Sequence, residues 1–258
     1  MSSETAVRSF VCDQAQVSVC PSRAELGIAA ANKTAELIQA AVEKRGRARI
    51  IVATGNSQLD FIGSLVGHAE VPWPQVEVFH MDEYIGLPAG HPASFRLWIK
   101  NRVEDKLPLA AVHYIRGDAP DADAEIARYS AMLEEAPIDC AFVGFGENGH
   151  IAFNDPPSAD FDDPVSMKVV VLDEACRRQQ AGEGHFKDAA SVPRTAITIT
   201  CPGLFRADAW ICCVPEGRKA QAVRNALTGP ISTACPASVV RRHPAAWVFL
   251  DADSASLL

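Results

Sequence analysis

A glycine-rich segment in the middle of the chain, GFGENGHIAFNDP (residues 144–156), carries one histidine among polar neighbours. His150 follows Asn148 by two residues and precedes Asp155 by five. Imidazole changes its charge near neutral pH, so this side chain suits proton transfer. An amide and a carboxylate beside it can orient or polarise the ring. The segment predicts an acid–base histidine, although a histidine that only caps a turn would have the same neighbours.

Three of these glycines, Gly144, Gly146 and Gly149, also match the spacing of a dinucleotide-binding loop. Such a loop opens a helix whose N-terminal amides hold a pyrophosphate. The following HIAFNDPP contains two prolines and several turn formers and does not begin a regular helix. A bend that directs His150 into a cleft is the better interpretation. A zinc site is disfavoured, because no second histidine stands at helical spacing.

A second polar signature, HMDEY (residues 80–84), follows an apolar strand-like run. A carboxylate partly shielded from water at a strand end can remove a proton from carbon. Adjacent strand residues face opposite sides, so Asp82 and Glu83 cannot share this role. Two alternatives remain open at this stage: a solvated acidic turn, and a metal site formed by His80 with Asp82.

A third signature, ATGNS (residues 53–57), connects a strand pattern to a helix pattern. Its backbone N–H groups, at Thr54, Gly55, Asn56 and Ser57, together with the Thr54 and Ser57 hydroxyls, can cradle a phosphate. The loop lacks the Gly-Lys-Ser/Thr ending of a Walker A motif. Lys219, in PEGRKA, can supply positive charge, unless it is a solvated lysine at a helix start.

The elements that must position these residues alternate along the chain. Helices are predicted at 22–47, 58–68, 91–107, 121–136 and 218–229, and strands at 48–57, 75–84, 138–146, 195–205, 209–217 and 245–253. An apolar stretch at 167–175 precedes a Gln/Gly-rich segment at 179–191 with weak periodicity. This alternation predicts a single α/β domain over residues 1–258: three layers, with a mostly parallel central sheet and helices on both faces (Rossmann-like, doubly wound). Ligands of such sheets bind beyond the carboxyl ends of the strands, so the three signatures should converge on one cleft.

The overall composition excludes several classes of function. A net charge of −8 without a Lys/Arg-rich run argues against a nucleic-acid partner or an anionic membrane surface. No apolar run reaches the roughly 18–20 residues that span a bilayer, and the N-terminus lacks a signal-peptide pattern. The eight cysteines form no CxxC pair, which favours a reduced, cytoplasmic protein.

The candidate residues together indicate one kind of chemistry. A small phosphorylated substrate, a base and an imidazole acid fit ring opening and proton transfer in a sugar phosphate.

The segments FHMDEYIGLPAGHPASFRLWI and GFGENGHIAFNDP, in this order and at this separation, resemble the glucosamine-6-phosphate deaminase (isomerase) family, within the larger group that includes 6-phosphogluconolactonases. The likeness covers nearly the whole chain. It implies isomerisation and deamination of a 6-phosphorylated amino sugar, most simply glucosamine 6-phosphate to fructose 6-phosphate and ammonia. It further implies that Asp82 is the base, that His150 opens the ring beside Asn148 and Asp155, and that Thr54–Ser57 and Lys219 bind phosphate. No metal or organic cofactor belongs to this mechanism.

The chain departs from the pattern of this family at several positions. Asp155 stands where the family carries Glu, which shortens the reach of the carboxylate by about 1.5 Å. The phosphate-binding arginine of the family lies in a mobile lid equivalent to about 170–192, where Arg177, Arg178 and the later Arg194 are the candidates. Only Lys168 is basic within 160–168, so the allosteric activation seen in some members is not expected. The likeness also suggests a homo-oligomer.

Two alternative functions remain open from the sequence. One is hydrolysis of 6-phosphogluconolactone, which uses the same histidine but no base at C2. The other is a non-catalytic sugar-phosphate sensor on the same fold. The presence of both Asp82 and His150 counts against a sensor, because a sensor requires neither.

Overall fold

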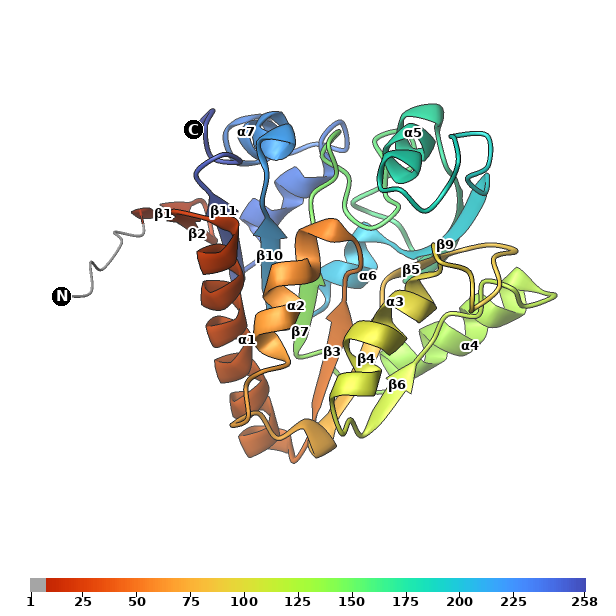
Figure 1. Ribbon diagram of the computed structural model, residues 1–258, viewed down its shortest axis with the longest axis horizontal. Coiled ribbons are helices and arrows are strands. Elements are labelled where there is room, and N and C mark those ends of the chain that lie inside the picture. The colour runs from red at the N-terminus through yellow and green to blue at the C-terminus, as the bar shows by residue number, and fades with distance from the viewer. Residues whose placement is uncertain (1–7) are drawn as a thin grey trace.

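The computed structural model describes residues 8–258 and contains an eight-stranded main sheet within that range (Figure 1). Residues 1–7, which belong to the N-terminal segment without a signal-peptide pattern, lie outside the described residues. The strand order in the main sheet is β1-β2-β11-β10-β7-β3-β4-β6. Their bounds are β1 (Arg8–Cys12), β2 (Ala15–Cys20), β3 (Ala48–Val52), β4 (Val76–His80), β6 (Ala111–His113), β7 (Cys140–Val143), β10 (Trp210–Val214) and β11 (Ala246–Asp251). Every pair in this sheet is parallel except β1–β2.

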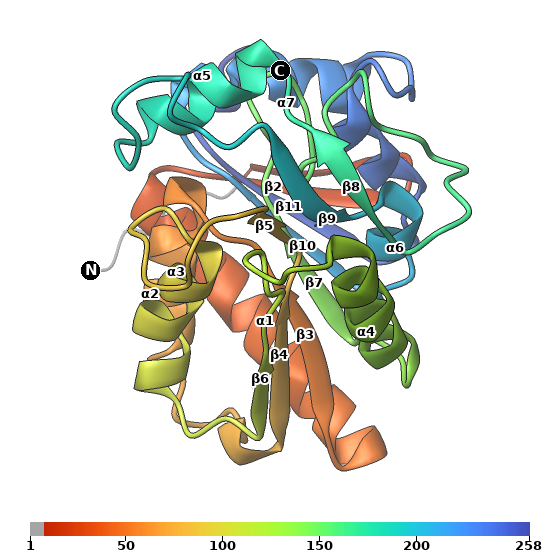
Figure 2. The same ribbon diagram turned by 90° about the vertical axis from the view of Figure 1, so that its right-hand side faces the viewer.

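Helices cover both faces of the main sheet, as the predicted fold class requires (Figure 2). Helices α1 (Arg23–Arg45), α2 (Leu59–Leu65) and α3 (Phe95–Arg102) lie on one face, and α4 (Ala122–Glu134) and α6 (Cys201–Phe205) on the other. Helices α5 (Glu174–Gly182) and α7 (Ala220–Thr228) lie beyond the end at which the central strands finish (Figure 1). Short 3-10 helices lie between these strands and helices along the chain: η1 (Asn56–Gln58), η2 (Trp73–Gln75), η3 (Glu104–Lys106), η4 (Gly217–Lys219) and η5 (Pro236–Arg242).

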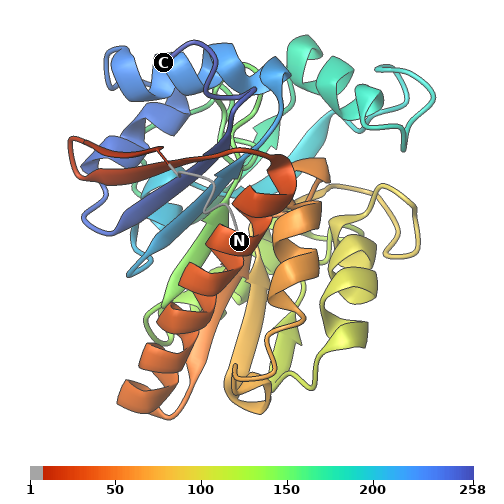
Figure 3. The same cartoon turned by 60° about the vertical axis from the view of Figure 1, so that its left-hand side comes forward.

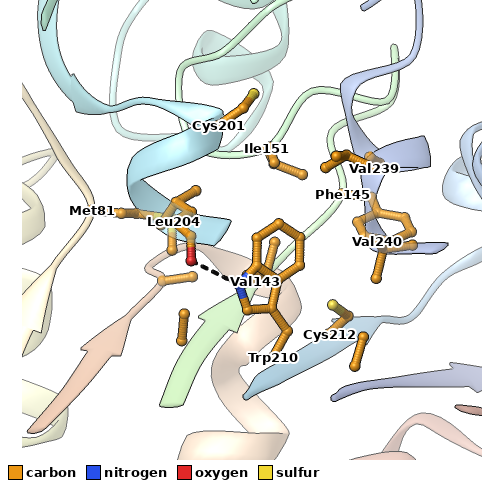
Figure 4. Packing of buried hydrophobic residues seen from close by; sticks show 14 of the residues in the cluster. Met81, Val143, Phe145, Ile151, Cys201, Leu204, Trp210, Cys212, Val239 and Val240 are labelled. Carbon is orange, nitrogen blue, oxygen red and sulfur yellow. Dashed lines mark hydrogen bonds between the residues drawn. The ribbon is translucent and has the colours of Figure 1, made fainter. Parts of the chain in front are cut away.

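The core forms on both sides of the sheet because successive strand residues point to opposite faces. In β3, Ile51 packs into the cluster under α4 and α6, whereas Ile50 and Val52 pack into the cluster under α1 and α2. Trp210 of β10 is fully buried, and its indole N–H donates to the carbonyl of Leu204 at 2.9 Å (Figure 4). The central strands β3 and β10 are therefore supported by packed side chains on both faces of the sheet.

The predicted helix at 22–47 is confirmed as α1, which lies across one face of the sheet (Figure 3). The Ser22 hydroxyl accepts from the Glu25 backbone N–H and caps the first turn. Gly46 ends the helix in the left-handed region with φ +73°, a conformation that favours glycine.

The predicted strand at 75–84 is wrong in one respect, because it divides at Met81. Strand β4 ends at His80, and β5 (Asp82–Tyr84) belongs to a second, three-stranded antiparallel sheet of order β5-β9-β8. The other two strands are β8 (Met167–Val171) and β9 (Thr195–Ile199). The change of sheet places Asp82 at the junction, where the end of a main-sheet strand meets a separate layer.

Other boundaries also differ from the sequence prediction. The predicted strand at 195–205 ends at Ile199, because Thr200 caps α6 by accepting from the Gly203 N–H. The helix predicted at 91–107 is reduced to α3 and the turn η3. The N-terminal hairpin β1–β2 and the short edge strand β6 had no sequence prediction. These differences leave the predicted class of fold unchanged, because the main sheet is still mostly parallel with helices on both faces.

Candidate active site

The candidate site is a cleft at the carboxyl ends of four adjacent strands, β10, β7, β3 and β4. It contains about 620 Å³ of empty space, part of it open to solvent. The three signatures follow β7, β3 and β4, and the PEGRKA segment with Lys219 follows β10. The lining residues that were predicted are Thr54, Gly55, Asn56, Ser57, Asp82, His150 and Lys219. The predicted convergence on one cleft is therefore confirmed.

His150 occupies the loop after β7 and is almost fully buried. Its Nδ1 lies 3.0 Å from Oδ1 of Asp155, at an angle too bent for a good hydrogen bond. The Asn148 side chain joins the two, because its Oδ1 accepts from the His150 backbone N–H at 3.0 Å and its Nδ2 donates to Asp155 Oδ1 at 2.9 Å. Asn148 thus links the histidine loop to Asp155, although neither Asn148 nor Asp155 is a lining residue of the cleft. The predicted effect of both residues on the imidazole stays a prediction.

The histidine ring lies directly against the backbone of Gly146. A Cβ atom on Gly146 would be 2.2 Å from Cε1 of His150, which no real side chain tolerates. Gly149 has φ +84°, the left-handed conformation that a tight turn requires here. Two of the three glycines of the apparent dinucleotide motif thus shape the bend that positions His150.

Asp155 is buried, and two opposing influences act on its carboxyl group. Burial raises the pKa of Asp155, but the neighbouring His150 and the Asn148 amide outweigh burial and hold that pKa below its usual range. The carboxylate form is therefore favoured beside the imidazole. The shorter side chain at this position still reaches the ring.

Asp82 lies at the start of β5, and its carboxylate forms no hydrogen bond or ion pair within residues 8–258. Burial, with a smaller contribution from Glu83, raises the pKa of Asp82 well above its usual value. A carboxylate destabilised in this way is a stronger base than one in water. This position therefore favours removal of a proton from a bound substrate.

Glu83 faces away from the cleft, as the alternation of strand side chains predicts. Its carboxylate accepts from the Ser94 hydroxyl at 2.7 Å and from Nε of Arg96 at 3.3 Å. It also accepts backbone N–H groups in the first turn of α3. Glu83 thus anchors α3, and the interpretation of HMDEY as a solvated acidic turn is wrong.

The alternative metal site at His80 and Asp82 finds no support in the geometry. His80 is fully buried, its Nδ1 lies 2.9 Å from the Asp82 carbonyl, and its Nε2 accepts from the Ile115 N–H at 2.9 Å. Burial lowers the pKa of His80 to about 3, so the ring is neutral. Both ring nitrogens are thus engaged by backbone groups. No group of three or more His, Cys, Asp or Glu side chains in the described part of the chain is placed to hold a metal ion.

The predicted phosphate loop follows β3 and begins η1. Gly55 has φ +103°, a conformation that favours glycine, and all four residues Thr54–Ser57 line the cleft. Arg23, at the start of α1, holds this loop by donating to the carbonyl of Asn56 and to the carboxylate of Asp60. The loop therefore presents its backbone from a fixed position.

Lys219 is 4% exposed and lines the same cleft. Its ammonium group forms no hydrogen bond or ion pair with any residue in the described range, which is unusual for a buried charge. Burial lowers the pKa of Lys219, and the nearby Arg218 lowers it further. A buried cation without a partner points to an anionic ligand.

Helix α5 and the residues after it supply side chains that the sequence did not reveal. Gln179, Gln180 and Glu183 line the cleft, whereas Arg177, Arg178 and Arg194 do not. Arg178 pairs with Glu174, and Arg177 donates to the Ala189 carbonyl. None of the three candidate arginines is thus placed to bind phosphate in this arrangement. The weak periodicity of this segment gave no signal for its cleft-facing residues.

Arg218 is a further lining residue that sequence reasoning missed, although it adjoins Lys219 in PEGRKA. Its guanidinium binds Glu216 at 2.5 Å and Glu147 at 3.1 Å. These pairs neutralise much of its charge toward the cleft. Among the described residues that line the cleft, Lys219 is then the cation without an ion-pair partner.

Comparisons with known proteins agree with this geometry. The family model described as glucosamine-6-phosphate isomerases/6-phosphogluconolactonase matches residues 21–249. A protein of Listeria welshimeri named glucosamine-6-phosphate deaminase is 33% identical over 231 residues, which are 90% of this chain and 96% of the relative. A protein of the same name from Bacillus cytotoxicus is 31% identical over 222 residues, which are 86% of this chain and 82% of the relative.

Two solved structures share the fold of this chain. The structure described as a monomeric glucosamine-6-phosphate deaminase superposes with a TM-score of 0.85 and 29% identity, covering 94% of this chain and 99% of that one. A 6-phosphogluconolactonase from Trypanosoma brucei has a TM-score of 0.75 at 20% identity, covering 94% and 98%, which shows the shared fold. The chain belongs to the glucosamine-6-phosphate isomerase/6-phosphogluconolactonase family.

Proposed function

We propose that this chain isomerises and deaminates a 6-phosphorylated amino sugar, converting glucosamine 6-phosphate and water to fructose 6-phosphate and ammonia. The observation that carries the proposal is the shared cleft, which brings an unpaired buried carboxylate, an imidazole and an unpaired buried cation together. The relatives at 31–33% identity carry the name of this activity. Another hexosamine 6-phosphate is the next candidate substrate.

In this proposal, the phosphate binds the backbone of Thr54–Ser57 and the ammonium group of Lys219. A phosphate dianion would give Lys219 the partner that it lacks in the protein alone. Binding there places the sugar ring toward His150 and Asp82 across the same cleft. The phosphate subsite therefore sets the position of the reacting carbons.

The chemistry proceeds in two proton-transfer stages. His150, oriented by Asn148 and Asp155, moves the proton between the anomeric hydroxyl and the ring oxygen, so that the ring opens to the aldehyde. Asp82 then removes the C2 proton and returns it to C1, while the C1 oxygen gains a proton and the amine nitrogen loses one, which converts the aldose amine to a ketose imine. Water adds to the imine carbon, and the C2–N bond breaks to release ammonia. No step requires an external oxidant or reductant.

The environment of Asp82 favours this reaction over hydrolysis of 6-phosphogluconolactone. Lactone hydrolysis uses an imidazole to activate water and requires no base at C2. Burial of Asp82 makes it a competent carbon base, which would have no use in a lactonase. A non-catalytic sensor would likewise gain nothing from it.

A direct assay tests the proposal. The purified protein, given glucosamine 6-phosphate, should release ammonia and form fructose 6-phosphate in equal amounts, and should leave 6-phosphogluconolactone largely unhydrolysed. A panel of hexosamine 6-phosphates with ammonia as readout identifies the preferred sugar. Lactone hydrolysis without ammonia release would replace this proposal with the lactonase alternative.

The cellular location, the oligomeric state and the absence of allosteric activation stay predictions. No helix within residues 8–258 is long and apolar enough to cross a membrane, and a cytoplasmic location remains to be measured. A homo-oligomer remains an expectation, and one similar structure is described as monomeric. Lys168 binds Asp163 at 2.7 Å, and activation by an amino sugar is still not expected.

A further inference from the structure

Glu183, directly after α5, places a carboxylate over the proposed phosphate loop. A Cβ atom built on Gly55 would lie 3.6 Å from Oε2 of Glu183, and both residues line the cleft. This carboxylate forms no hydrogen bond or ion pair with any residue in the range 8–258. It is therefore an unpaired anion at the point where an incoming phosphate would bind.

Glu183 also lies within electrostatic reach of Lys219. Its negative charge favours the ammonium form of Lys219 and so opposes the effect of burial on the pKa of that group. The carboxylate and the ammonium do not form an ion pair, so the Lys219 ammonium remains free to bind an anionic ligand. While no ligand is bound, the Glu183 carboxylate thus partly balances the positive charge of Lys219.

Glu183 is partly exposed and lies between two glycines at the C-terminal end of α5. Gly182 and Gly184 flank it, and a Cβ atom at either glycine would meet no atom within 4 Å. Gly184 has φ +92°, a conformation that few other residues adopt. Displacement of Glu183 from the cleft therefore requires no disruption of packed core.

We propose that Glu183 is an affinity-determining residue of the phosphate subsite: its carboxylate supplies the negative charge beside Lys219 while the cleft is empty, and it must leave when the phosphate binds. This inference rests on the proposed function in that it takes the Thr54–Ser57 loop as the phosphate subsite. A phosphate dianion close to a carboxylate is disfavoured, so phosphate binding must include the displacement of Glu183. Glu183 therefore competes with the phosphate and weakens its binding.

The test measures anion binding to the ligand-free protein without turnover. Inorganic phosphate is titrated into the wild type, Glu183→Gln and Glu183→Ala by isothermal titration calorimetry. Both variants should bind phosphate about tenfold more tightly than the wild type, because each removes the competing charge. Two variants are needed because the glutamine amide can itself donate to phosphate, whereas alanine cannot.

A matched control is Glu174→Gln, at the start of α5. Glu174 is exposed, pairs with Arg178 and does not line the cleft, so the same change in net charge should leave phosphate affinity unchanged. Equal tightening in this control would attribute the effect to net charge and overturn the inference. Three other outcomes would also overturn the inference. They are tighter phosphate binding in Glu183→Gln alone, unchanged or weaker binding in both Glu183 variants, and no phosphate binding to any form of the protein.

Kinetics separate this inference from the proposed function. Glu183→Gln should lower KM for glucosamine 6-phosphate in parallel with the phosphate Kd. If the wild type binds phosphate but does not turn over the sugar, the proposed function fails while the phosphate titration still decides the role of Glu183. If the sugar is turned over and the titration shows no tightening, only the role of Glu183 fails.

Discussion

Nδ1 of His150 lies 3.0 Å from Oδ1 of Asp155, so a side chain one methylene shorter than the family's glutamate still reaches the imidazole. The Asn148 amide shares the same carboxylate oxygen at 2.9 Å. The backbone of the loop, held by the hydrogen bond from Gly146 N–H to the His150 carbonyl at 2.8 Å, brings the two groups together. The short carboxylate at position 155 is therefore compatible with the proposed role of His150.

The substitution Asp155→Asn should reduce kcat by about 10- to 100-fold, because the ring loses the charge that orients it. KM should change little, since Asp155 does not line the cleft. The folded-state pKa of Asp155 is depressed, so its contribution to stability is present above the usual Asp pKa and disappears as pH falls through the folded value. Denaturant titrations should thus show the variant less stable than wild type at pH 7, with the difference vanishing in acid. Wild-type kcat in the variant would contradict the role assigned to Asp155.

The substitution Asp82→Asn should abolish most activity and stabilise the fold. Loss of the base should lower kcat by about 10³-fold. The folded-state pKa of Asp82 is raised, so the charged form costs stability above the usual Asp pKa, and an amide removes this cost. We expect a gain of about 1 kcal/mol at pH 7.5, or about 2–4 °C in Tm, that shrinks as pH falls toward 4. A variant that is both inactive and less stable at pH 7.5 would indicate a structural role.

The substitution Gly146→Ala should displace the imidazole. The new methyl group would overlap Cε1 of His150, so the ring must rotate away from its position. We expect kcat to fall by about 100-fold. The matched control is Gly63→Ala in α2, where the added Cβ meets no atom within 4 Å and activity should be unchanged. Full activity in Gly146→Ala would show that the position of the ring is not critical.

The substitution Lys219→Met should weaken phosphate binding and stabilise the protein. Loss of the charge should raise KM by about 100-fold, since hydrogen bonds to charged groups contribute about 1.5–3 kcal/mol. The folded-state pKa of Lys219 is lowered, so its ammonium form costs stability at neutral pH, and methionine removes that cost. The exposed Lys106→Met serves as control for both readouts. An unchanged KM would remove Lys219 from the phosphate subsite.

The substitution Glu83→Ala should act on stability and only weakly on catalysis. It removes one of the two carboxylates that bind the buried Arg96, the other being Asp118, and it removes the anchor for the first turn of α3. Together these losses should cost about 3 kcal/mol in the free energy of unfolding. The folded fraction should retain kcat within about tenfold, because Glu83 faces away from the cleft. A loss of kcat as large as that in Asp82→Asn would mean that the two carboxylates share a role.

The sequence by itself determined the class of fold and most of the proposed site. Helix α1 carries its boundaries in local signals, Ser22 and Gly46, which act within a few residues of the chain. The signatures after β3, β4 and β7 were identifiable because parallel strands bring their carboxyl ends to one edge. The same rule placed Thr54–Ser57, Asp82 and His150 in one cleft before their contacts were known.

Only the tertiary structure decided what depends on contacts between distant segments. The break at Met81 arises because β5 pairs with β9, more than 100 residues away, and no local pattern encodes that pairing. The pKa of Asp82 rises because other elements bury it. The residues of α5 and its C-terminal end reach the cleft through packing, which brings Glu183 there and leaves the nearby arginines outside. Burial and pairing across the chain are collective properties, so they are absent from any short stretch of sequence.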